Sequence, residues 1–498
     1  MLQHFLVLGA GSAGLLAAIT LKRKVPGVAV RVVRSREKGV IGVGESTTPG
    51  LPRFLFNYLG IRRRVFYEKA EPTWKLGIRF LWGPRDHFDY SFLAQLDGQW
   101  SDLPRPNGFY CDQTFKNVNY GGALMQQDKA FLRQQNGAPE IDDAHAFHLY
   151  NPKLVEALEV LARDLGVEFI DANVAGATRG PAGIASVQLD DGRSLEADFF
   201  VDASGFRSEL LGRALEEPFV SFASSLFCDR AVVGGWEREP HEPILPYTVA
   251  ETMDAGWCWR IDHEHLTNRG YVFSSQALTD DQAHDEFMRK NPRAKTWDHL
   301  VKFKSGRYER GWVGNVLGVG NACGFVEPLE ATALMVVCWQ LQAFADMINQ
   351  SGANPPPTMQ ELFNKQWAAT WDEIRDFLTL HYKFNTRLDT PFWQHARNDT
   401  NISRLTELLK FYDENGPTGF LRYQLGNTGS QFGVEGFLVM LVGNQVPYRA
   451  KYGPSEQEWR VWNAHCAQMQ QAAATQGIDA KEALSFIRHP SWRWTDEQ

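Results

Sequence analysis

Short apolar runs and a small-residue loop alternate at the start of the chain. An apolar run at residues 3–8 is followed by the loop Gly9–Gly14 (Gly-Ala-Gly-Ser-Ala-Gly), a helical pattern over about Leu15–Lys24, and a second β-type run at Val28–Val33. This order predicts a βαβ unit in which the loop opens the helix. Glycines at that place let backbone amides approach a pyrophosphate group. We therefore expect a dinucleotide to bind here.

Strand patterns dominate the middle of the chain. Residues 220–320 are mostly strand-like, and Trp257, Trp259 and Ile261 occupy alternate positions. Alternate residues point to one face of a strand, so these three are predicted to lie together. Earlier in the chain, Asn151-Pro152 is expected to cap a helix.

From about residue 350 the pattern changes to helix. Apolar residues recur at helical spacing over Met359–Phe384, and Ser455-x-x-Glu458 is a capping box ahead of a helix to about Gln476. The predicted fold is α/β, with a Rossmann-like βαβ core, a mixed β-sheet region and a mostly helical C-terminal third. We expect a nucleotide-binding module with an interleaved substrate-binding sheet over 1–350, and a helical subdomain that completes the substrate pocket over 351–498.

A second small-residue loop precedes the most apolar helical segment. Gly320–Ala333 runs into Ala331–Ile348, a segment predicted to be a buried helix. Amides at a helix start are free donors at the positive end of the helix dipole, so they suit a small anion. Glu330 stands beside them, which indicates either a separate chemical task or a simple N-terminal cap.

Three further features are candidates for contact with the cofactor, and one of them, the loop at 39–50, lies where a long cofactor would continue from the first loop. Arg34 occupies the end of the second strand, where an acidic residue commonly binds a ribose; it either approaches the cofactor or is a surface charge. The glycine-rich segment at 39–50 contains Glu45, and Asp202–Gly205 (Asp-Ala-Ser-Gly) is typical of flavoproteins.

The apolar run Trp74–Phe80 contains one lysine, Lys75. A lysine in such a run is usually solvated, but a buried one becomes a reactive amine or a fixed donor.

Composition narrows the function classes. The chain has 498 residues, a formal net charge of −8 and six cysteines without C-x-x-C spacing. We therefore expect no nucleic-acid partner, no zinc or other structural metal, and a reducing cytoplasm as the location. We also expect neither a signal peptide nor a membrane-spanning segment.

Several motifs occur together in a fixed order, and the combination is more specific than the glycine loop alone. They are the loop at Gly9, Gly42–Thr47, Lys75 within Trp-Lys-Leu-Gly-Ile, Val201–Phe206, Trp257-x-Trp259-x-Ile261, Gly324–Glu330 and Asp389–Trp393. Nearly end to end, the chain resembles the flavin-dependent halogenases of the tryptophan halogenase family, in an indole-directed form with an altered substrate-gripping region.

The resemblance implies FAD as cofactor, supplied as FADH2 by a separate flavin reductase, with O2 and halide as co-substrates. Hypohalous acid would travel through a tunnel to Lys75, which would hold it by a hydrogen bond or as a haloamine and deliver the halogen to a small aromatic substrate. Glu330 would polarise the electrophile or accept the proton lost from the ring. Thr332 and Ala333 would bind the halide through their amides, and Trp257 and Trp259 would keep the substrate away from the flavin.

The FAD-binding module would comprise residues 1–350, and the resemblance also implies a possible homodimer. The positions that it assigns to the cofactor are Gly9, Gly11, Ser12, Ala13, Gly14, Arg34, Gly42, Val43, Gly44, Glu45, Val174, Asp202 and Gly320.

Three departures from the family pattern bear on the reaction. Ala331-Thr332-Ala333 stands where Ser-Thr-Gly is usual, which removes a hydroxyl and changes the halide site. Asp262 stands where proline is usual. Gly436-Phe437 aligns with a pair of tyrosines that grip free tryptophan in other members. We therefore expect a simple indole, another electron-rich arene, or a larger or carrier-bound indole. Both halides stay open, and bromide is our hypothesis because it is more easily oxidised than chloride.

Two other functions share the glycine loop and the Asp202 region. One is a single-component flavin monooxygenase that hydroxylates an aromatic compound, and the other is a non-catalytic flavin-binding protein. Neither needs Lys75 together with Glu330, so these two residues favour the halogenase.

Overall fold

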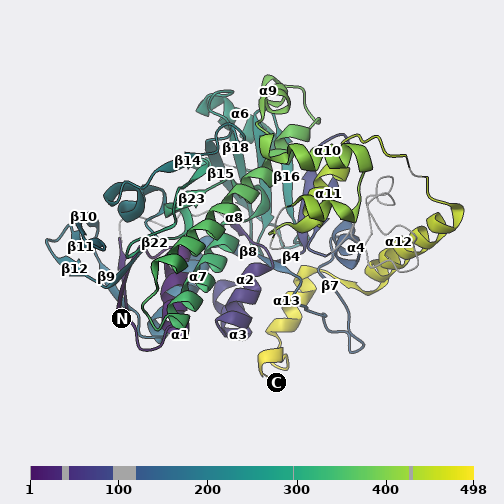
Figure 1. Ribbon diagram of the computed structural model, residues 1–498. Coiled ribbons are helices and arrows are strands. Elements are labelled where there is room, and N and C mark those ends of the chain that lie inside the picture. Colours follow the sequence, from purple (N-terminus) through teal and green to yellow (C-terminus); the bar gives the residue numbers. More distant parts are fainter. Residues whose placement is uncertain are drawn as a thin grey trace. The chain divides into compact units, whose positions relative to one another are not determined.

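The computed structural model of the protein describes residues 2–35, 44–93, 119–294, 297–425, 430–451 and 453–497 (Figure 1). Its contacts divide the chain into two compact units, each assembled from three segments. Unit 1 comprises Met1–Pro72, Leu149–Phe222 and Phe303–Asp372, and unit 2 comprises Thr73–His148, Ala223–Lys302 and Glu373–Gln498. The expected division into a nucleotide-binding module over 1–350 and a helical subdomain over 351–498 stays a prediction.

Unit 1 is built on a six-stranded sheet. In spatial order its strands are β21 (Trp312–Val313), β22 (Val316–Gly318), β13 (Phe199–Asp202), β1 (His4–Leu8), β2 (Ala29–Arg34) and β9 (Glu168–Asp171). All pairs are parallel except β21–β22. Phe5 to Leu8 of β1 are buried, as expected for a central parallel strand covered on both faces. The predicted βαβ unit is therefore confirmed.

Two helices of unit 1 pack against α1 (Ser12–Lys24). α1 contacts both α5 (Asn151–Asp164) and α7 (Ala333–Gln350). The expectation that Asn151 caps α5 is wrong, because Tyr150 is the N-cap and Asn151 already belongs to the helix. The Asn151 side chain instead accepts a hydrogen bond from Ser12 Oγ at 2.9 Å, which joins the starts of α1 and α5.

The rest of unit 1 consists of short elements and two small sheets. The short elements are β3 (Gly44–Ser46), α2 (Gly50–Pro52), the π-helix η1 (Arg53–Tyr58), α3 (Arg63–Ala70), η3 (Gly205–Arg207), η4 (Glu209–Ala214), η5 (Gly320–Ala322) and η6 (Pro328–Glu330). One small sheet is β10 (Val174–Gly180), β11 (Gly183–Leu189) and β12 (Ser194–Glu196); the other is β14 (Phe219–Ser221), β20 (Gly306–Tyr308) and β23 (Gly324–Phe325).

Unit 2 contains a seven-stranded mixed sheet. Its spatial order is β19 (Trp297–Lys302), β15 (Arg230–Glu237), β18 (Leu266–Phe273), β17 (Gly256–Asp262), β16 (Thr248–Met253), β5 (Gly77–Leu81) and β6 (Phe88–Ser91). β5 and β16 are parallel, and the other neighbours are antiparallel. Beside this sheet, β4 (Thr73–Lys75) pairs antiparallel with β8 (Ala146–Tyr150). Two further short strands, β7 (Phe131–Leu132) and β24 (Gly477–Ile478), form an antiparallel pair.

Helices make up most of the C-terminal third, as predicted. They are α8 (Pro357–Phe384), α9 (Pro391–Asp399), α10 (Thr406–Asn415), α11 (Gly433–Gly443), α12 (Glu456–Gln476) and α13 (Ala480–Arg488). The Ser455–Glu458 capping box is present with both of its hydrogen bonds. In the described part of unit 2, two α-helices lie earlier in the chain: α4 (Tyr120–Gln126) and α6 (Asp280–Lys290). Of the helices described, none is long and apolar enough to cross a membrane.

Candidate active site

The first glycine loop has the close backbone contacts that its sequence predicts. Gly9 has φ +109°, and a Cβ atom on it would lie 2.3 Å from the carbonyl oxygen of Ala203. A Cβ on Gly14 would lie 2.0 Å from the oxygen of Gly9. Gly11 differs, because a Cβ there would meet no atom of the described residues within 4 Å. Gly9 and Gly14 thus permit tight packing, while Gly11 borders open space at the start of α1.

A second glycine brings the later loop to the first one. Gly320 has φ +58°, and a Cβ on it would lie 2.9 Å from the Cβ of Ala13. Ser12, which precedes Ala13 in the loop, donates its hydrogen bond to Asn151. The structure therefore places Gly9, Ala13 and Gly320 together, as expected for a single cofactor-binding region.

Asp202 is fully buried at the end of β13, and its carboxylate oxygens bind nearby donors. Oδ1 accepts hydrogen bonds from the backbone and side chain of Ser204, and Oδ2 accepts them from the amides of Leu210 (2.7 Å) and Leu211 (2.9 Å). Burial raises the pKa of this carboxyl, and these hydrogen bonds act in the opposite direction. Asp202 thus fixes the turn that follows β13, and its contact with cofactor stays a prediction.

Arg34 is engaged by two carboxylates of unit 1. Its guanidinium lies 2.6 Å from Glu159 and 2.6 Å from Asp171, and it packs over the ring of Phe169. The hydrogen bond to Asp171 is the main cause that raises the pKa of Arg34. A cofactor that contacts Arg34 would have to share its guanidinium group with Glu159 and Asp171.

Val174, another residue assigned to the cofactor, starts β10 and pairs with Leu189 across the small sheet.

Glu45 lies in β3, immediately after Gly44. Removal from water raises the pKa of Glu45 to about 7, although part of the side chain remains accessible. Gly42 and Val43, which were also assigned to the cofactor, lie outside the described residues. Glu45 is therefore a carboxyl whose charge depends on pH close to neutrality.

The start of α7 differs in detail from the sequence prediction. Pro328–Glu330 form a 3-10 turn, Ala331 has φ +56°, and Thr332 is the N-cap of a helix that begins at Ala333. Glu330 is therefore not the cap, and its side chain is buried. Among the residues that the structure describes, no side chain caps this helix at Thr332. Alanine in the left-handed region is strained by about 1 kcal/mol, so the surrounding fold holds this turn in place.

Lys75, in unit 2, is fully buried at the end of β4. Its Nζ lies 5.3 Å from the centroid of the Phe92 ring, within the range of a cation–π contact. Trp74, on the opposite face of the strand, packs edge-on against Phe131. Buried lysines are rare in proteins unless they are paired or functional, so the solvated alternative is excluded for Lys75.

The backbone on both sides of Lys75 is tied to the neighbouring mixed sheet. Thr73 Oγ1 donates a 2.8 Å hydrogen bond to the carbonyl of Asp262, and the amide of Leu76 donates one of 2.7 Å to the carbonyl of Pro246. The Leu76 carbonyl accepts the amide of Phe92 at 2.9 Å. These contacts fix both the lysine strand and the ring beneath its ammonium group.

Trp257 and Trp259 lie on one face of β17, as their alternation predicts. Their ring centroids are 6.0 Å apart, and both side chains are buried. Within the described part of the chain, neither indole nitrogen has a hydrogen-bond partner. Cys258, between them, packs on the opposite face against residues of α6. The two indoles thus form a fixed aromatic surface.

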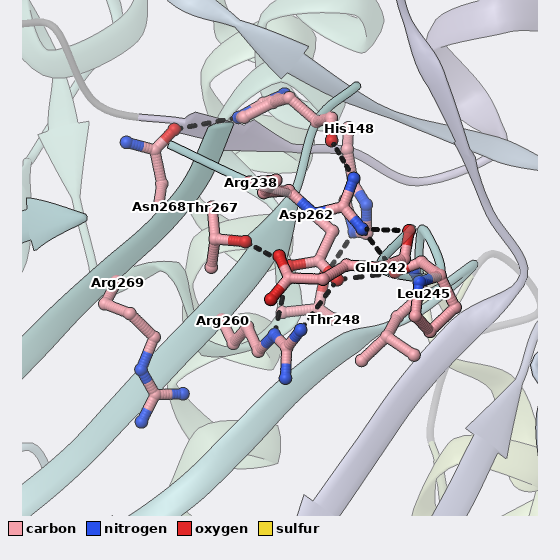
Figure 2. Close-up of polar contacts among 12 residues, drawn as sticks. His148, Arg238, Glu242, Leu245, Thr248, Arg260, Asp262, Thr267, Asn268 and Arg269 are labelled. Atoms are coloured by element: carbon pink, nitrogen blue, oxygen red, sulfur yellow. Dashed lines mark hydrogen bonds and ion pairs between the residues drawn. The ribbon is translucent and has the colours of Figure 1, made fainter. Parts of the chain in front are cut away.

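Asp262, the residue that replaces the usual proline, is the centre of a buried polar cluster (Figure 2). Its Oδ1 accepts hydrogen bonds from Thr267 Oγ1 at 2.8 Å and Arg260 Nε at 3.0 Å. Its Oδ2 accepts hydrogen bonds from Arg260 at 3.0 Å and from the amide of Leu245 at 3.3 Å. Sequence reasoning singled out Asp262 only as a departure from the family pattern.

Sequence reasoning missed His148, which lies on β8 directly opposite Thr73. Residues paired across antiparallel strands share a face, so His148 and Lys75 lie on the same side of the β4–β8 pair. His148 is fully buried, and its Nε2 lies 2.9 Å from Thr248 Oγ1. Burial, and then the charge of Lys75, lower the pKa of His148 well below its ordinary value. The only sequence signal was a polar residue inside an apolar strand.

Comparison with known proteins assigns most of the chain to one family. The family profile described as "Tryptophan halogenase" matches residues 4–455. The chain belongs to the tryptophan halogenase family. A curated relative of this halogenase, tryptophan 7-halogenase RebH of Lentzea aerocolonigenes, is 30% identical over 82% of each chain. Tryptophan 6-halogenase ThaL of Streptomyces albogriseolus is 30% identical over 79% of this chain and 78% of its own length.

Solved structures of flavin-dependent halogenases share the fold. MibH, described as a lanthipeptide tryptophan 5-halogenase, has a TM-score of 0.88 and 37% identity, covering 100% of this chain and 96% of its own. BrvH from Brevundimonas sp. BAL3 has a TM-score of 0.83 and 26% identity, covering 98% and 99%. This halogenase is therefore a flavin-dependent enzyme that halogenates an aromatic compound.

The first loop of the halogenase fits the FAD that its family uses. Among the described residues, none fills the space at Gly11 and no side chain caps α1, and the first turn of α1 contains no acidic residue that would repel a pyrophosphate. Free amides at such a helix start bind phosphate groups well. Residues Gly9 to Gly14 would thus hold the pyrophosphate, with Gly320 packed against them.

Proposed function

We propose that this halogenase brominates or chlorinates the ring of an indole-type substrate and that Lys75 delivers the halogen. The observation that carries this proposal is the full burial of Lys75 at the end of a short strand fixed on both sides. A placed amine in a dry environment is suited to hold a small electrophile, whereas a solvated lysine would release it to water.

Lys75 and Glu330 would have separate roles in the transfer of halogen to the ring. When bound and reduced by a separate flavin reductase, FAD would supply the chemistry by which O2 oxidises halide to hypohalous acid. Lys75 Nζ then binds the acid or exchanges a proton for the halogen with release of water. The halogen passes to a ring carbon as the bond to oxygen or nitrogen breaks. Glu330 accepts the proton that the same carbon loses, which is general base catalysis.

The halide would bind at the start of α7. Thr332 and Ala333 present backbone amides there without a capping side chain, and the helix dipole favours an anion. Ala333 is an ordinary helical residue, so its methyl group adds bulk without backbone strain. We propose bromide as the preferred halide. Equal concentrations of both halides would test this, and a dominant chlorinated product would overturn it.

The proposed substrate is an indole other than free tryptophan. A Cβ on Gly436 would lie 2.7 Å from the hydroxyl oxygen of Tyr90 and 3.2 Å from Phe377, so that position has no room for a tyrosine. If Gly436 aligns with the gripping pair of tryptophan-specific members, a tyrosine of that pair would not fit here. MibH is named for a lanthipeptide, which supports a larger, chain-bound indole as one candidate.

A product assay tests the function. Purified protein would receive FAD, a generic flavin reductase with NADH, O2 and bromide, and then indole, tryptophan or a short tryptophan-containing peptide. We expect a product with the bromine isotope doublet from indole or from the peptide, and no such product from Lys75→Ala, which should still bind FAD. Halogenation by Lys75→Ala at the wild-type rate would overturn the role of Lys75, and a hydroxylated product would overturn the halogenase function.

A further inference from the structure

The carboxylate of Asp262 joins three parts of unit 2. It binds Arg260 on its own strand, Thr267 on β18, and the amide of Leu245 in the segment before β16. No part of the Asp262 side chain is exposed. Its neighbour Arg238 is also buried, and Arg238 donates to backbone carbonyls that include those of His263 and Glu264. The cluster is therefore a closed polar network in which Asp262 is the central acceptor.

The same residue reaches both flanks of Lys75. The backbone carbonyl of Asp262 accepts the Thr73 hydroxyl two residues before the lysine. The Leu245 segment that its carboxylate holds continues into Pro246, whose carbonyl accepts the amide one residue after the lysine. Figure 2 shows Asp262 between Thr267, Arg260 and the Leu245 segment. One buried residue thus links the two hydrogen bonds that fix the lysine strand.

We propose that Asp262 is a positioning residue for Lys75, which it holds in register through Thr73 on one side and the Leu245–Pro246 segment on the other. The proposal rests on the function proposed above, in which Lys75 delivers the halogen. It also accounts for the departure from proline, because a proline at this position has no side-chain acceptor for Thr267, Arg260 and Leu245.

Charge favours an aspartate over a neutral acceptor in this position. Burial lowers the pKa of Arg238, and the negative charge of Asp262 acts against that effect. The strand bearing Asp262 also carries Arg260. An uncharged side chain would leave Arg260 without this ion pair and would remove the largest charge that opposes the effect of burial on Arg238, and the network would relax. Such a relaxation would be transmitted to the two residues that flank Lys75.

The test compares delivery of halogen with its formation. Hypohalous acid is measured by a soluble diketone trap, and arene product by mass spectrometry in the same holoenzyme reaction. For Asp262→Asn we expect unchanged formation of hypohalous acid and at least about a tenfold fall in the fraction delivered to indole, because misplacement of a reacting group by 1 Å costs up to ~10²-fold. Parallel loss of both quantities would show a merely structural role and overturn the proposal.

A second pair of variants does not disturb the carboxylate. Thr73→Val keeps the shape of the side chain but removes the hydroxyl that binds the Asp262 carbonyl, and Thr73→Ser keeps that hydroxyl. We expect Thr73→Val to lose delivery in the same way as Asp262→Asn, and Thr73→Ser to retain it. Equal delivery by Thr73→Val and wild type would overturn the proposal.

Two controls separate the possible failures. Glu286→Gln changes another buried carboxylate of unit 2, which accepts a hydrogen bond from the Asp254 amide at 2.9 Å, and this variant should leave delivery unchanged. Loss of delivery in Glu286→Gln would show that any buried carboxylate has this effect and would overturn the proposal. Lys75→Ala is measured alongside. Full delivery of halogen by Lys75→Ala would overturn the proposed function itself. If Lys75→Ala loses delivery but Asp262→Asn and Thr73→Val deliver as well as wild type, only the positioning role is overturned.

Discussion

The indole ring of Trp259 rests directly on the backbone of Gly270. A Cβ atom on Gly270 would lie 1.9 Å from Cζ2 of Trp259, and the two residues face each other across the antiparallel β17–β18 pair. Trp259 in turn contacts Trp257. Gly270 therefore sets the position of both indoles.

Gly270→Ala should displace Trp259 and destabilise the fold by about 1–3 kcal/mol, because the added methyl group overlaps the ring. Unfolding in denaturant and tryptophan fluorescence would measure both effects. If the two indoles separate substrate from flavin, the variant should also form a hydroxylated by-product. Gly176→Ala in β10 is the matched control, since among the described residues its Cβ would meet only Gln188 Oε1, at 3.9 Å. Equal stability of Gly270→Ala and wild type would contradict the observed contact.

Elements specified by nearby residues were predictable from the sequence. The β1–α1–β2 unit follows from a glycine loop between apolar runs, and the capping box at Ser455 fixes the start of α12 within four residues. The face shared by Trp257 and Trp259 follows from strand alternation alone. Helix α6 was missed because its mostly polar sequence lies within a region of strands. The capping box at Thr279, where α6 begins, was the signal that could have revealed it.

Roles that depend on distant partners could not be predicted. Asn151 looked like a cap by local rules, yet its partner Ser12 lies 139 residues away in sequence. Asp262 is 189 residues from Thr73, and nothing near Asp262 in the sequence marks that contact. The family motif located Lys75, but its burial and its two flanking hydrogen bonds came only from the fold.

Glu330→Gln should slow halogen transfer more than formation of hypohalous acid. The amide keeps the size of the side chain but cannot accept the ring proton, and general base catalysis typically contributes about 10²–10⁴-fold. Arene product and trapped hypohalous acid would be followed in single-turnover reactions. Glu327→Gln, in the same buried turn, is the control and should affect transfer far less. Equal loss of both steps in Glu330→Gln would place this residue in halide or flavin chemistry instead.

Gly436→Tyr should destabilise the protein without creating activity on free tryptophan. The Tyr90 hydroxyl and Phe377 already occupy the space beside Gly436. Tyr90→Ala should partly relieve this overlap, so the double variant is expected to lose at least about 1 kcal/mol less than the sum of the single variants. Denaturant unfolding of all four proteins completes the cycle. Strictly additive losses, or efficient halogenation of tryptophan by Gly436→Tyr alone, would contradict the proposed account of specificity.

His263 should make the fold less stable in mild acid. Burial lowers the pKa of His263 to about 4, with a partly compensating hydrogen bond to Asn268. Because this pKa is below the unfolded value, the contribution of His263 is complete above about pH 6.5 and is lost as the pH falls toward 4. The full effect is roughly 3 kcal/mol.

The difference in unfolding free energy between wild type and His263→Gln isolates this effect from other titrating groups. It should change between pH 7 and 4 in favour of the variant, because glutamine does not gain a proton. His265→Gln provides the control, since 84% of the His265 side chain is exposed and folding leaves it in water. A constant difference for His263→Gln across this range would show that His263 takes up its proton as readily in the folded protein as in the unfolded chain.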